Sequence, residues 1–243
     1  MKDKAIIQPI SRKRLAKSDF VILVSAEPDI KPLIQELRLK NIEKKRLMMS
    51  SVYKGIYKDI SVSIIGPMIG APYATLIFEE MIAAGGQKFI FFGWCGSLSK
   101  EVSIGDCIIP NASFIDEGTS KCYPEASDIS YPDQDQSEKI YKIIKGIHSV
   151  HQGKIWCTDG FYQETPEKVK YYQKKNAMGV EMETSALFTV GKYRQVSIAA
   201  LLVVSDNLHD LSWQTGFKSP EFEKGRMQSF EAISKYIAEE HLS

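Results

Sequence analysis

Short apolar runs alternate with amphipathic stretches along nearly the whole chain. Runs of several adjacent apolar residues, typical of buried strands, occur at 20–25, 88–93, 107–110, 154–157 and 198–205. Residues 53–65 alternate around Gly55 and predict a hairpin with Ile60, Val62 and Ile64 on one face. Helical spacing predicts helices at 32–40, 72–84, 137–148, 166–175 and 220–240.

The regular alternation of predicted strands and helices favours an α/β fold. Residues 123–136 are rich in Pro, Asp and Ser, which is typical of a surface loop. No linker is long enough to divide the chain. The sequence therefore predicts a single α/β domain over residues 1–243, with a central mixed β-sheet flanked by helices.

Composition excludes several classes of partner. The 31 Lys and Arg residues nearly balance the 30 Asp and Glu residues, so the formal net charge is +1. We therefore expect no general attraction to nucleic acid or to an anionic membrane surface. No apolar run approaches the roughly 20 residues that a membrane-spanning helix needs, so no membrane partner is predicted.

The cysteines and histidines indicate neither disulfides nor a metal site. Cys95, Cys107, Cys122 and Cys157 are widely spaced and form no CxxC pair. This pattern predicts reduced thiols in a cytoplasmic protein. The four histidines form no HxxH or HExxH motif, so no metal and no other bound cofactor is predicted.

The strongest candidate for a functional site is the segment from Gly179 to Phe188. It places Glu181 and Glu183 where an apolar strand turns into a helix. In an extended stretch the two side chains point to the same side, where a carboxylate can accept both hydrogen bonds of a cis-diol. The alternative is that both acids only stabilise the positive N-terminal end of the helix, and the segment alone does not separate the two.

A second candidate follows the last predicted strand. Asp206 comes directly after Ser205, at a strand end where α/β folds bind ligands. Arg226, on the final predicted helix, would favour the ionised carboxylate if it lay beside Asp206. The plainer alternatives are a turn aspartate, which this position alone favours, and a solvated arginine.

Two further segments follow strands and could contribute to the same site. Phe161 could stack on a planar base, although an aromatic residue at such a position is more often part of the core. The segment around Gly93 and Trp94 predicts a glycine-rich turn of the kind that binds anions through backbone N–H groups. A single pattern of this kind is weakly specific.

Taken together, these segments resemble the nucleoside phosphorylase-I family, which includes purine nucleoside phosphorylases, uridine phosphorylases and methylthioadenosine/S-adenosylhomocysteine nucleosidases. The resemblance extends from about Phe20 to Ile237 and implies a nucleoside phosphorylase-like fold. The most specific part is Val180-Glu181-Met182-Glu183 in register with Ser205-Asp206. Further matching segments are Asp116 to Ser120, Tyr53-Lys54-Gly55, Gly66 to Pro72 and Phe161-Tyr162.

The resemblance implies a role for each matching residue. Glu183 would hold the ribose hydroxyls with Met182 against the sugar, and Phe161 would stack on the base. Asp206, with Ser205 beside it, would protonate or hydrogen-bond the leaving base, and Arg226 would assist it. Uridine phosphorylases lack this acid, so the resemblance implies a purine base.

The phosphate-binding residues of the family are replaced here. Family members usually have an Arg near position 30, an Arg at position 91 and a Ser or Thr at position 94; this chain has Ile30, Phe91 and Trp94. Phosphate needs charge-assisted donors, which these side chains cannot supply. Glu27 adds negative charge and matches loosely the Glu that activates water in the nucleosidases. Arg46 matches loosely an Arg that a neighbouring subunit contributes.

The sequence therefore predicts a phosphorylase-family enzyme with an atypical phosphate site that cleaves the N-glycosidic bond of a nucleoside, with phosphate or water as the acceptor; the resemblance implies that the base is a purine. The alternatives are a phosphate-independent nucleosidase, a uridine-type phosphorylase and a non-catalytic nucleoside-binding protein. Homo-oligomers are common in the family, so the resemblance also implies a second copy of the chain as partner.

Overall fold

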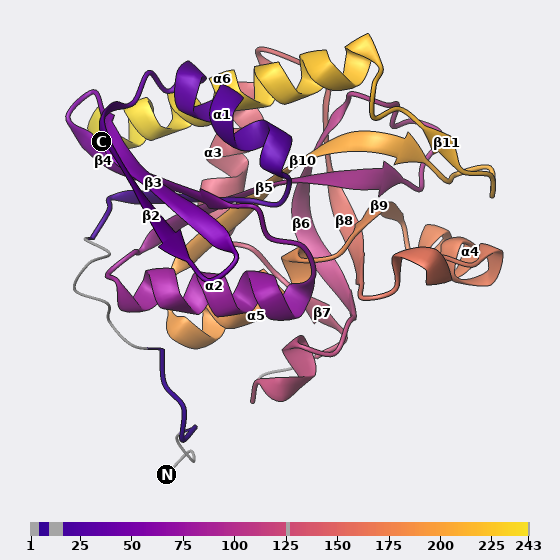
Figure 1. The fold of residues 1–243 in the computed structure, drawn as a ribbon. Helices are drawn as coiled ribbons and strands as arrows, with labels where there is room; N and C mark the ends of the chain where they lie inside the picture. Colours follow the sequence, from indigo (N-terminus) through magenta and orange to yellow (C-terminus); the bar gives the residue numbers. More distant parts are fainter. Residues whose placement is uncertain (1–4, 10–16, 125–126, 243) are drawn as a thin grey trace.

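One large sheet with helices on both faces makes up the fold (Figure 1). The computed structural model describes residues 5–9, 17–124 and 127–242. The strands are β1 Phe20–Val24, β2 Lys40–Leu47, β3 Ser50–Tyr57, β4 Ile60–Gly66, β5 Lys88–Ser97, β6 Cys107–Asp116, β7 Ile129–Ser130, β8 Val150–Thr158, β9 Ala177–Glu181, β10 Ser197–Asn207 and β11 Gln214–Thr215. The helices are α1 Glu27–Glu36, α2 Ala71–Ala83, α3 Gln134–Lys145, α4 Pro166–Lys174, α5 Thr184–Arg194 and α6 Pro220–Leu242, with 3₁₀ turns η1 Ser120–Cys122 and η2 Phe161–Gln163.

The sheet is mixed, as the sequence predicts. Strands β4, β1, β5 and β10 run parallel to one another, and β3 and β2 extend this part as an antiparallel edge. On the other side β10 pairs with β6, and the order β6–β8–β9 leads back to β5. Five strands therefore close on themselves, which brings the ends of β5, β9 and β10 together.

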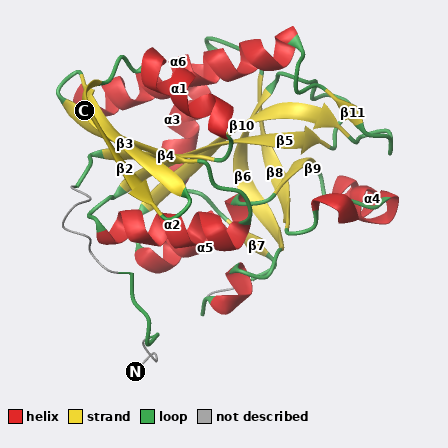
Figure 2. Cartoon of the chain, in the orientation of Figure 1, coloured by secondary structure: helices red, strands yellow, loops and turns green. Residues whose placement is uncertain are grey.

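Helices cover both faces of the sheet, in the arrangement shown in Figure 2. Helices α1, α3 and α6 pack on one face, and α2 and α5 pack on the other. Successive residues of β1 belong to the cores on opposite faces of the sheet. Ile22 packs in the core under α1, α3 and α6, and Leu23 packs in the core under α2 and α5. A strand buried on both faces reads as a continuous apolar run, which is why the sequence predicts β1 well.

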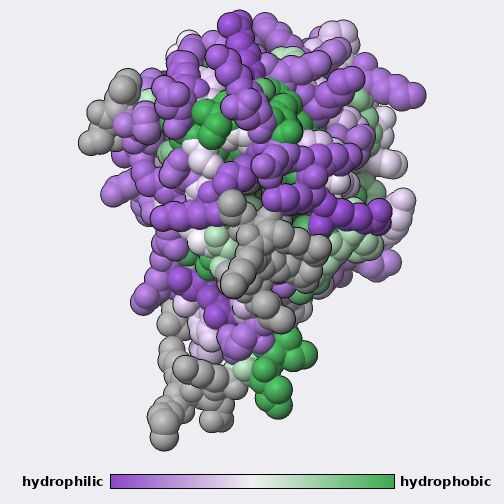
Figure 3. Space-filling view, turned by 60° about the vertical axis from the view of Figure 1, so that its left-hand side comes forward, coloured by the Kyte–Doolittle hydropathy of each residue, from purple (hydrophilic) through white to green (hydrophobic). Residues whose placement is uncertain are grey.

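The main differences from the predicted elements lie at polar or glycine-rich segments. The helix expected from residue 32 begins at Glu27, because Pro28 is favourable in a first turn. Residues 40–47 form the edge strand β2, although only Leu47 of them is buried. Charged side chains on an edge strand discourage pairing with another chain, and Figure 3 shows this side of the molecule as mostly hydrophilic.

The predicted glycine turn at Gly93 and Trp94 is wrong: both residues lie inside β5, which continues to Ser97. Gly96 pairs with Asp206 of β10 on one side and with Val180 of β9 on the other. A Cβ at Gly96 would approach Leu208 Cδ1 to 2.5 Å. A bulge between Val204 and Asp206 interrupts the β10 register and redirects the strand end.

Helix α6 approaches the sheet through a direct contact of two glycines. A Cβ at Gly225 would lie 2.1 Å from the carbonyl oxygen of Gly105 and 3.0 Å from Val203 Cγ1. Gly105 has φ +90°, a conformation that favours glycine. This contact sets the distance of α6 from β10 and with it the position of the following residue, Arg226.

We expect Gly225→Ala to destabilise the fold, since the added methyl meets backbone that cannot move without shifting α6. Overpacking of this kind costs about 1–3 kcal/mol. Urea unfolding of the variant measures the loss, and Lys224→Ala, at an exposed neighbour, is the matched control. Equal unfolding midpoints for the two variants would contradict the close contact.

Candidate active site

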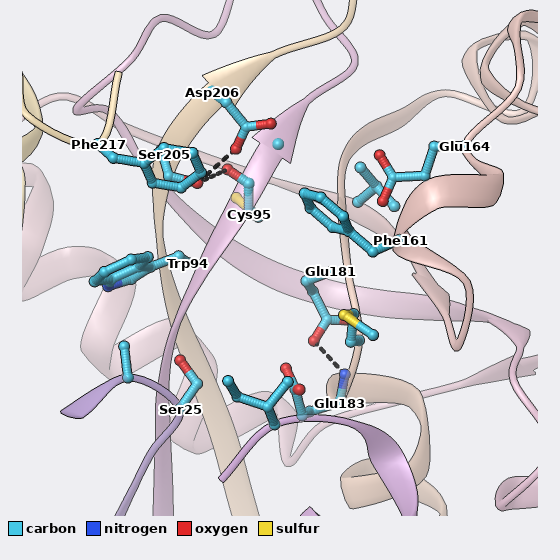
Figure 4. Close-up of a pocket in the computed structure, with 15 residues that line it drawn as sticks. Ser25, Trp94, Cys95, Phe161, Glu164, Glu181, Glu183, Ser205, Asp206 and Phe217 are labelled. Atoms are coloured by element: carbon cyan, nitrogen blue, oxygen red, sulfur yellow. Dashed lines mark hydrogen bonds between the residues drawn. The ribbon is translucent and has the colours of Figure 1, made fainter. Parts of the chain in front are cut away.

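The ends of β5, β9 and β10 border a cavity of about 400 Å³ (Figure 4). Fifteen residues line it, and they come from seven separate stretches of the chain. Four of them carry carboxyl groups, namely Glu164, Glu181, Glu183 and Asp206. None of the described residues that line it is Lys, Arg or His. The cavity is therefore strongly acidic, with apolar and aromatic walls.

Glu181 caps helix α5. One of its oxygens, Oε2, accepts hydrogen bonds from the backbone N–H groups of Glu183 and Thr184 at 2.7 and 2.8 Å. The other oxygen, Oε1, accepts one from Thr184 Oγ1 at 2.6 Å. Burial raises the pKa of Glu181, and these donors partly offset that rise. Glu181 therefore stabilises the N-terminal end of the helix, which is the alternative that the sequence left open, although Glu181 also lines the cavity.

Glu183 has a different environment. The strand ends at Glu181, so the two acids do not share the extended stretch that the sequence analysis assumed. Glu183 Oε1 accepts a hydrogen bond from the backbone N–H of Gly70 at 2.5 Å. Burial, reinforced by the nearby charge of Glu181, raises the pKa of Glu183 to about 8. Its carboxyl thus remains available to a ligand, with Met182 beside it in the cavity wall.

Asp206 is held from two sides. Ser205 Oγ donates to Asp206 Oδ1 at 2.6 Å, which places Ser205 beside the acid as predicted. The indole Nε1 of Trp213 donates to Asp206 Oδ2 at 2.8 Å. Asp206 is 4% exposed, so its orientation is fixed by these donors within the cavity wall.

Arg226 does not assist Asp206 in this structure. Its Nε donates to Asp29 Oδ1 at 2.5 Å, and its Nη2 donates to the carbonyl of Pro28 at 3.3 Å. Trp94 Nε1 donates to the other oxygen of Asp29 at 2.7 Å. Burial raises the pKa of Asp29, while Arg226 and Trp94 lower it. Arg226 therefore contacts Asp29 and not Asp206, because α6 places it over the start of α1.

Of the residues that the sequence predicts near the phosphate or water, one lines the cavity and three do not. Trp94 lines the cavity, with its ring against Phe222 and Phe217. Gly93 is buried in β5 and does not line the cavity. Glu27 is exposed at the start of α1 and does not line the cavity. Arg46 is exposed on β2 and donates to the carbonyl of Met48 at 3.0 Å.

Phe161 lines the cavity from η2, and its ring lies edge-on to Trp213 at 6.0 Å. It is 38% exposed, which leaves a ring face free for a planar ligand. Glu164, three residues further on, lines the same cavity. Among the described residues, the arrangement combines an aromatic surface and two acids at one end with Glu183 at the other (Figure 4).

Sequence reasoning missed four residues of this region: Asp29, Gly70, Glu164 and Trp213. Each contributes through a contact across the fold, and only Glu164 carried a local signal, as an acid three residues after Phe161. The described residues contain no cluster that could hold a metal ion. Cys95 lines the cavity, but burial and the charges of Asp206 and Glu181 raise its pKa far above the ordinary value, so it remains a thiol.

The comparisons with known proteins identify the family. Residues 19–240 match the family model described as the phosphorylase superfamily. The chain therefore belongs to the phosphorylase superfamily, which confirms the resemblance. No helix among the described residues is long and apolar enough to cross a membrane.

Two curated relatives show how far the sequence similarity extends. A guanosine phosphorylase of Halorubrum lacusprofundi is 29% identical over 153 residues, which are 63% of this chain and 64% of that protein. A DeoD-type purine nucleoside phosphorylase of Clostridium novyi is 32% identical over 160 residues, or 64% of this chain and 68% of that protein. The match thus spans about two thirds of each relative.

Two solved structures have the same fold. Uridine phosphorylase of Vibrio fischeri superposes with a TM-score of 0.82 at 24% identity, over 92% of this chain and 93% of that one. The 5′-methylthioadenosine/S-adenosylhomocysteine nucleosidase of Helicobacter pylori gives a TM-score of 0.76 at 22% identity, over 92% and 99%. These relatives and neighbours are enzymes, and they include both phosphorylases and a nucleosidase.

We expect Arg226→Met to destabilise the protein, because it leaves the fully buried Asp29 without its cation. Breaking a buried ion pair on one side costs about 3–5 kcal/mol. Adding Asp29→Asn should recover part of the loss. Urea unfolding checks both variants against Lys224→Met on the exposed side of α6, and a loss no greater than that of the control would contradict a structural role.

Glu183 should make stability depend on pH. Its pKa is raised from 4.5 to about 8 in the folded chain. Between these values the folded chain keeps a proton that the unfolded chain releases, so the free energy of unfolding falls as pH rises. We expect Glu183→Gln to flatten this fall between about pH 5 and pH 8. Thermal unfolding across that window checks it, with the exposed Glu223→Gln as control.

Proposed function

We propose that the protein cleaves the N-glycosidic bond of a purine nucleoside, with Asp206 at the leaving base and Glu183 at the ribose. The observation that carries the proposal is the single cavity that Glu183, Met182, Phe161, Ser205 and Asp206 share. They come from three separate stretches of the chain and provide the sugar ligand, the stacking surface and the acid that such a reaction needs. The purine nucleoside phosphorylase among the relatives supports the choice of base.

The reaction breaks the bond between C1′ of the ribose and the base nitrogen, whose electron pair leaves with the base. Asp206, in its protonated form, donates its proton or a hydrogen bond to the base nitrogen, and the acceptor forms a new bond to C1′. An acceptor water releases one proton to solvent as its oxygen bonds to C1′, which balances the proton that leaves with the base. General acid catalysis of this kind contributes about 10²–10⁴-fold to the rate. Trp213 and Ser205 hold the Asp206 carboxyl in a single orientation, which favours a reproducible geometry.

We further propose that water is the acceptor. A phosphate dianion would enter a cavity with four carboxyl groups and with no lining cation among the described residues. The buried side chains of Ile30 and Phe91 offer no donor, and Trp94 Nε1 is already bonded to Asp29. Phosphorolysis is the second candidate, favoured by the exposed position of Arg46 on β2, from which it could reach the cavity of a second copy.

Incubating the protein with adenosine, inosine, guanosine or uridine, with and without phosphate, tests both proposals. We expect free purine and ribose without phosphate. Ribose-1-phosphate formed only with phosphate, and lost in Arg46→Ala, would show that phosphate is the acceptor. Turnover of uridine alone would identify a uridine-type enzyme.

We expect Asp206→Asn to lower kcat by about 10²–10⁴-fold while the nucleoside still binds. Calorimetry separates binding from turnover, and Asp135→Asn, exposed on α3, is the matched control. Tight nucleoside binding by the unchanged protein, with no turnover of any substrate, would instead support a non-catalytic binding protein.

A further inference from the structure

Glu164 is a carboxyl group in the cavity wall that the reaction does not use. It follows η2 directly and borders both the main cavity and a smaller one of about 130 Å³ behind it. Leu208, Val169 and Trp213 line that smaller cavity and shield Glu164 from water. No hydrogen bond or ion pair joins its carboxyl to another part of the chain that the structure describes. A half-buried carboxyl without a partner is costly unless a ligand uses it.

The ionisable groups that line the main cavity with Glu164 are mostly acidic. Asp206 comes from β10, and Glu181 and Glu183 come from the β9–α5 turn across the cavity. The buried thiol of Cys95 is the remaining ionisable group in the wall. Lys168 of α4 bonds to Asp116 at 2.9 Å, and His209 lines a separate cavity. Burial, reinforced by the charge of Asp206, raises the pKa of Glu164 to about 8.

The protonation state of a carboxyl group decides which base edge it can pair with. A neutral carboxyl presents one donor and one acceptor side by side, whereas a carboxylate presents two acceptors. Adenine offers N1 as acceptor next to its 6-amino donor, and hypoxanthine offers O6 next to the N1–H donor. Guanine offers the same O6 and N1–H pair as hypoxanthine, and it adds the 2-amino donor next to N1–H. The two adjacent donors, N1–H and the 2-amino group, match a carboxylate.

Glu164 lies where its carboxyl group can pair with the edge of a bound base. Phe161, which supplies the stacking surface, is one 3₁₀ turn before it in the chain. Figure 4 shows Glu164, Phe161 and Asp206 at one end of the cavity and Glu183 at the other. A base that stacks on Phe161 and presents its five-membered ring to Asp206 therefore directs its six-membered ring toward Glu164.

We propose that Glu164 is a specificity-determining residue whose carboxyl group pairs with the edge of the six-membered ring of the purine base. This inference rests on the proposed cleavage of purine nucleosides. A neutral Glu164 can pair with adenosine and with guanosine, whereas an ionised Glu164 can accept both hydrogen bonds only from guanosine. The preference for adenosine relative to guanosine is therefore highest near neutral pH and declines as Glu164 ionises.

The ratio of kcat/KM for adenosine to kcat/KM for guanosine, measured from about pH 6.5 to about pH 9, tests the proposal. Groups that act on both substrates alike, such as Asp206 and Glu183, cancel in this ratio. We expect the ratio to fall about 10-fold across the range, the value of one well-placed hydrogen bond gained or lost. A ratio that stays constant would overturn the proposal.

Glu164→Gln provides the matched variant, because an amide keeps one donor and one acceptor at every pH. We expect it to preserve the adenosine preference and to remove the fall that Glu164 causes. Any remaining slope in this variant reports ionisation of guanosine itself. Glu164→Leu should lower kcat/KM for both nucleosides and should also remove the fall of the ratio, and the exposed Glu167→Gln of α4 should behave like the unchanged protein. A pH slope of the ratio that is the same in Glu164→Gln as in the unchanged protein would also overturn the assignment.

Failure of the proposed function can be distinguished from failure of the proposed role of Glu164. If no nucleoside is cleaved at any pH, the proposed function is wrong, and the same ratio is then measured from the dissociation constants of adenosine and guanosine. A pH-dependent binding ratio that Glu164→Gln removes would still support the role of Glu164. If purine nucleosides are cleaved but the ratio ignores both pH and the variants, only the role of Glu164 is wrong. Urea unfolding confirms that each variant is folded.

Discussion

The three hydrogen bonds that Glu181 accepts from the first turn of α5 determine the rest of the site. A buried carboxylate is tolerated when several donors satisfy it, and here the donors belong to the helix that the strand runs into. The bonds therefore fix the angle between β9 and α5. That angle sends the next acid, Glu183, toward Gly70 and the cavity. Glu181 thus stabilises the fold, and this leaves Glu183 facing the cavity.

The cavity that results brings four carboxyl groups together in a largely buried space. Glu183 and Glu164 both have a pKa raised to about 8, because burial disfavours their charged forms and another carboxylate lies near each. Such a site suits an uncharged ligand with many hydroxyl and ring-nitrogen groups. An anionic co-substrate is admitted only if a cation compensates for it. The one nearby arginine of α6 is already committed to Asp29, where it compensates for a charge inside the fold.

Parts of this site can be predicted from the sequence, because they depend on features of the chain that are local, such as the ends of strands. The acids at 181 and 183 follow a continuous apolar strand, and Ser205 and Asp206 end another, so strand ends mark them. The adjacency of Ser205 and Asp206 follows from the chain itself. Phe161 and Met182 were identified through the family resemblance, which the match over residues 19–240 confirms. The roles of these residues remain predictions, whereas their shared cavity is a property of the structure.

What the sequence determined by itself was the class of fold, the strands buried on both faces and the acids at two strand ends, since periodicity and strand boundaries are local properties. Only the tertiary structure decided the partners of those acids. Helix α6, held against β10 by the contact of Gly225 with Gly105, brings Arg226 to Asp29 and away from Asp206. The loop after β10 brings Trp213 to Asp206, and η2 places Glu164 in the cavity wall. The interaction and pKa of a charged group depend on which groups surround it in space, and chain order alone does not specify them.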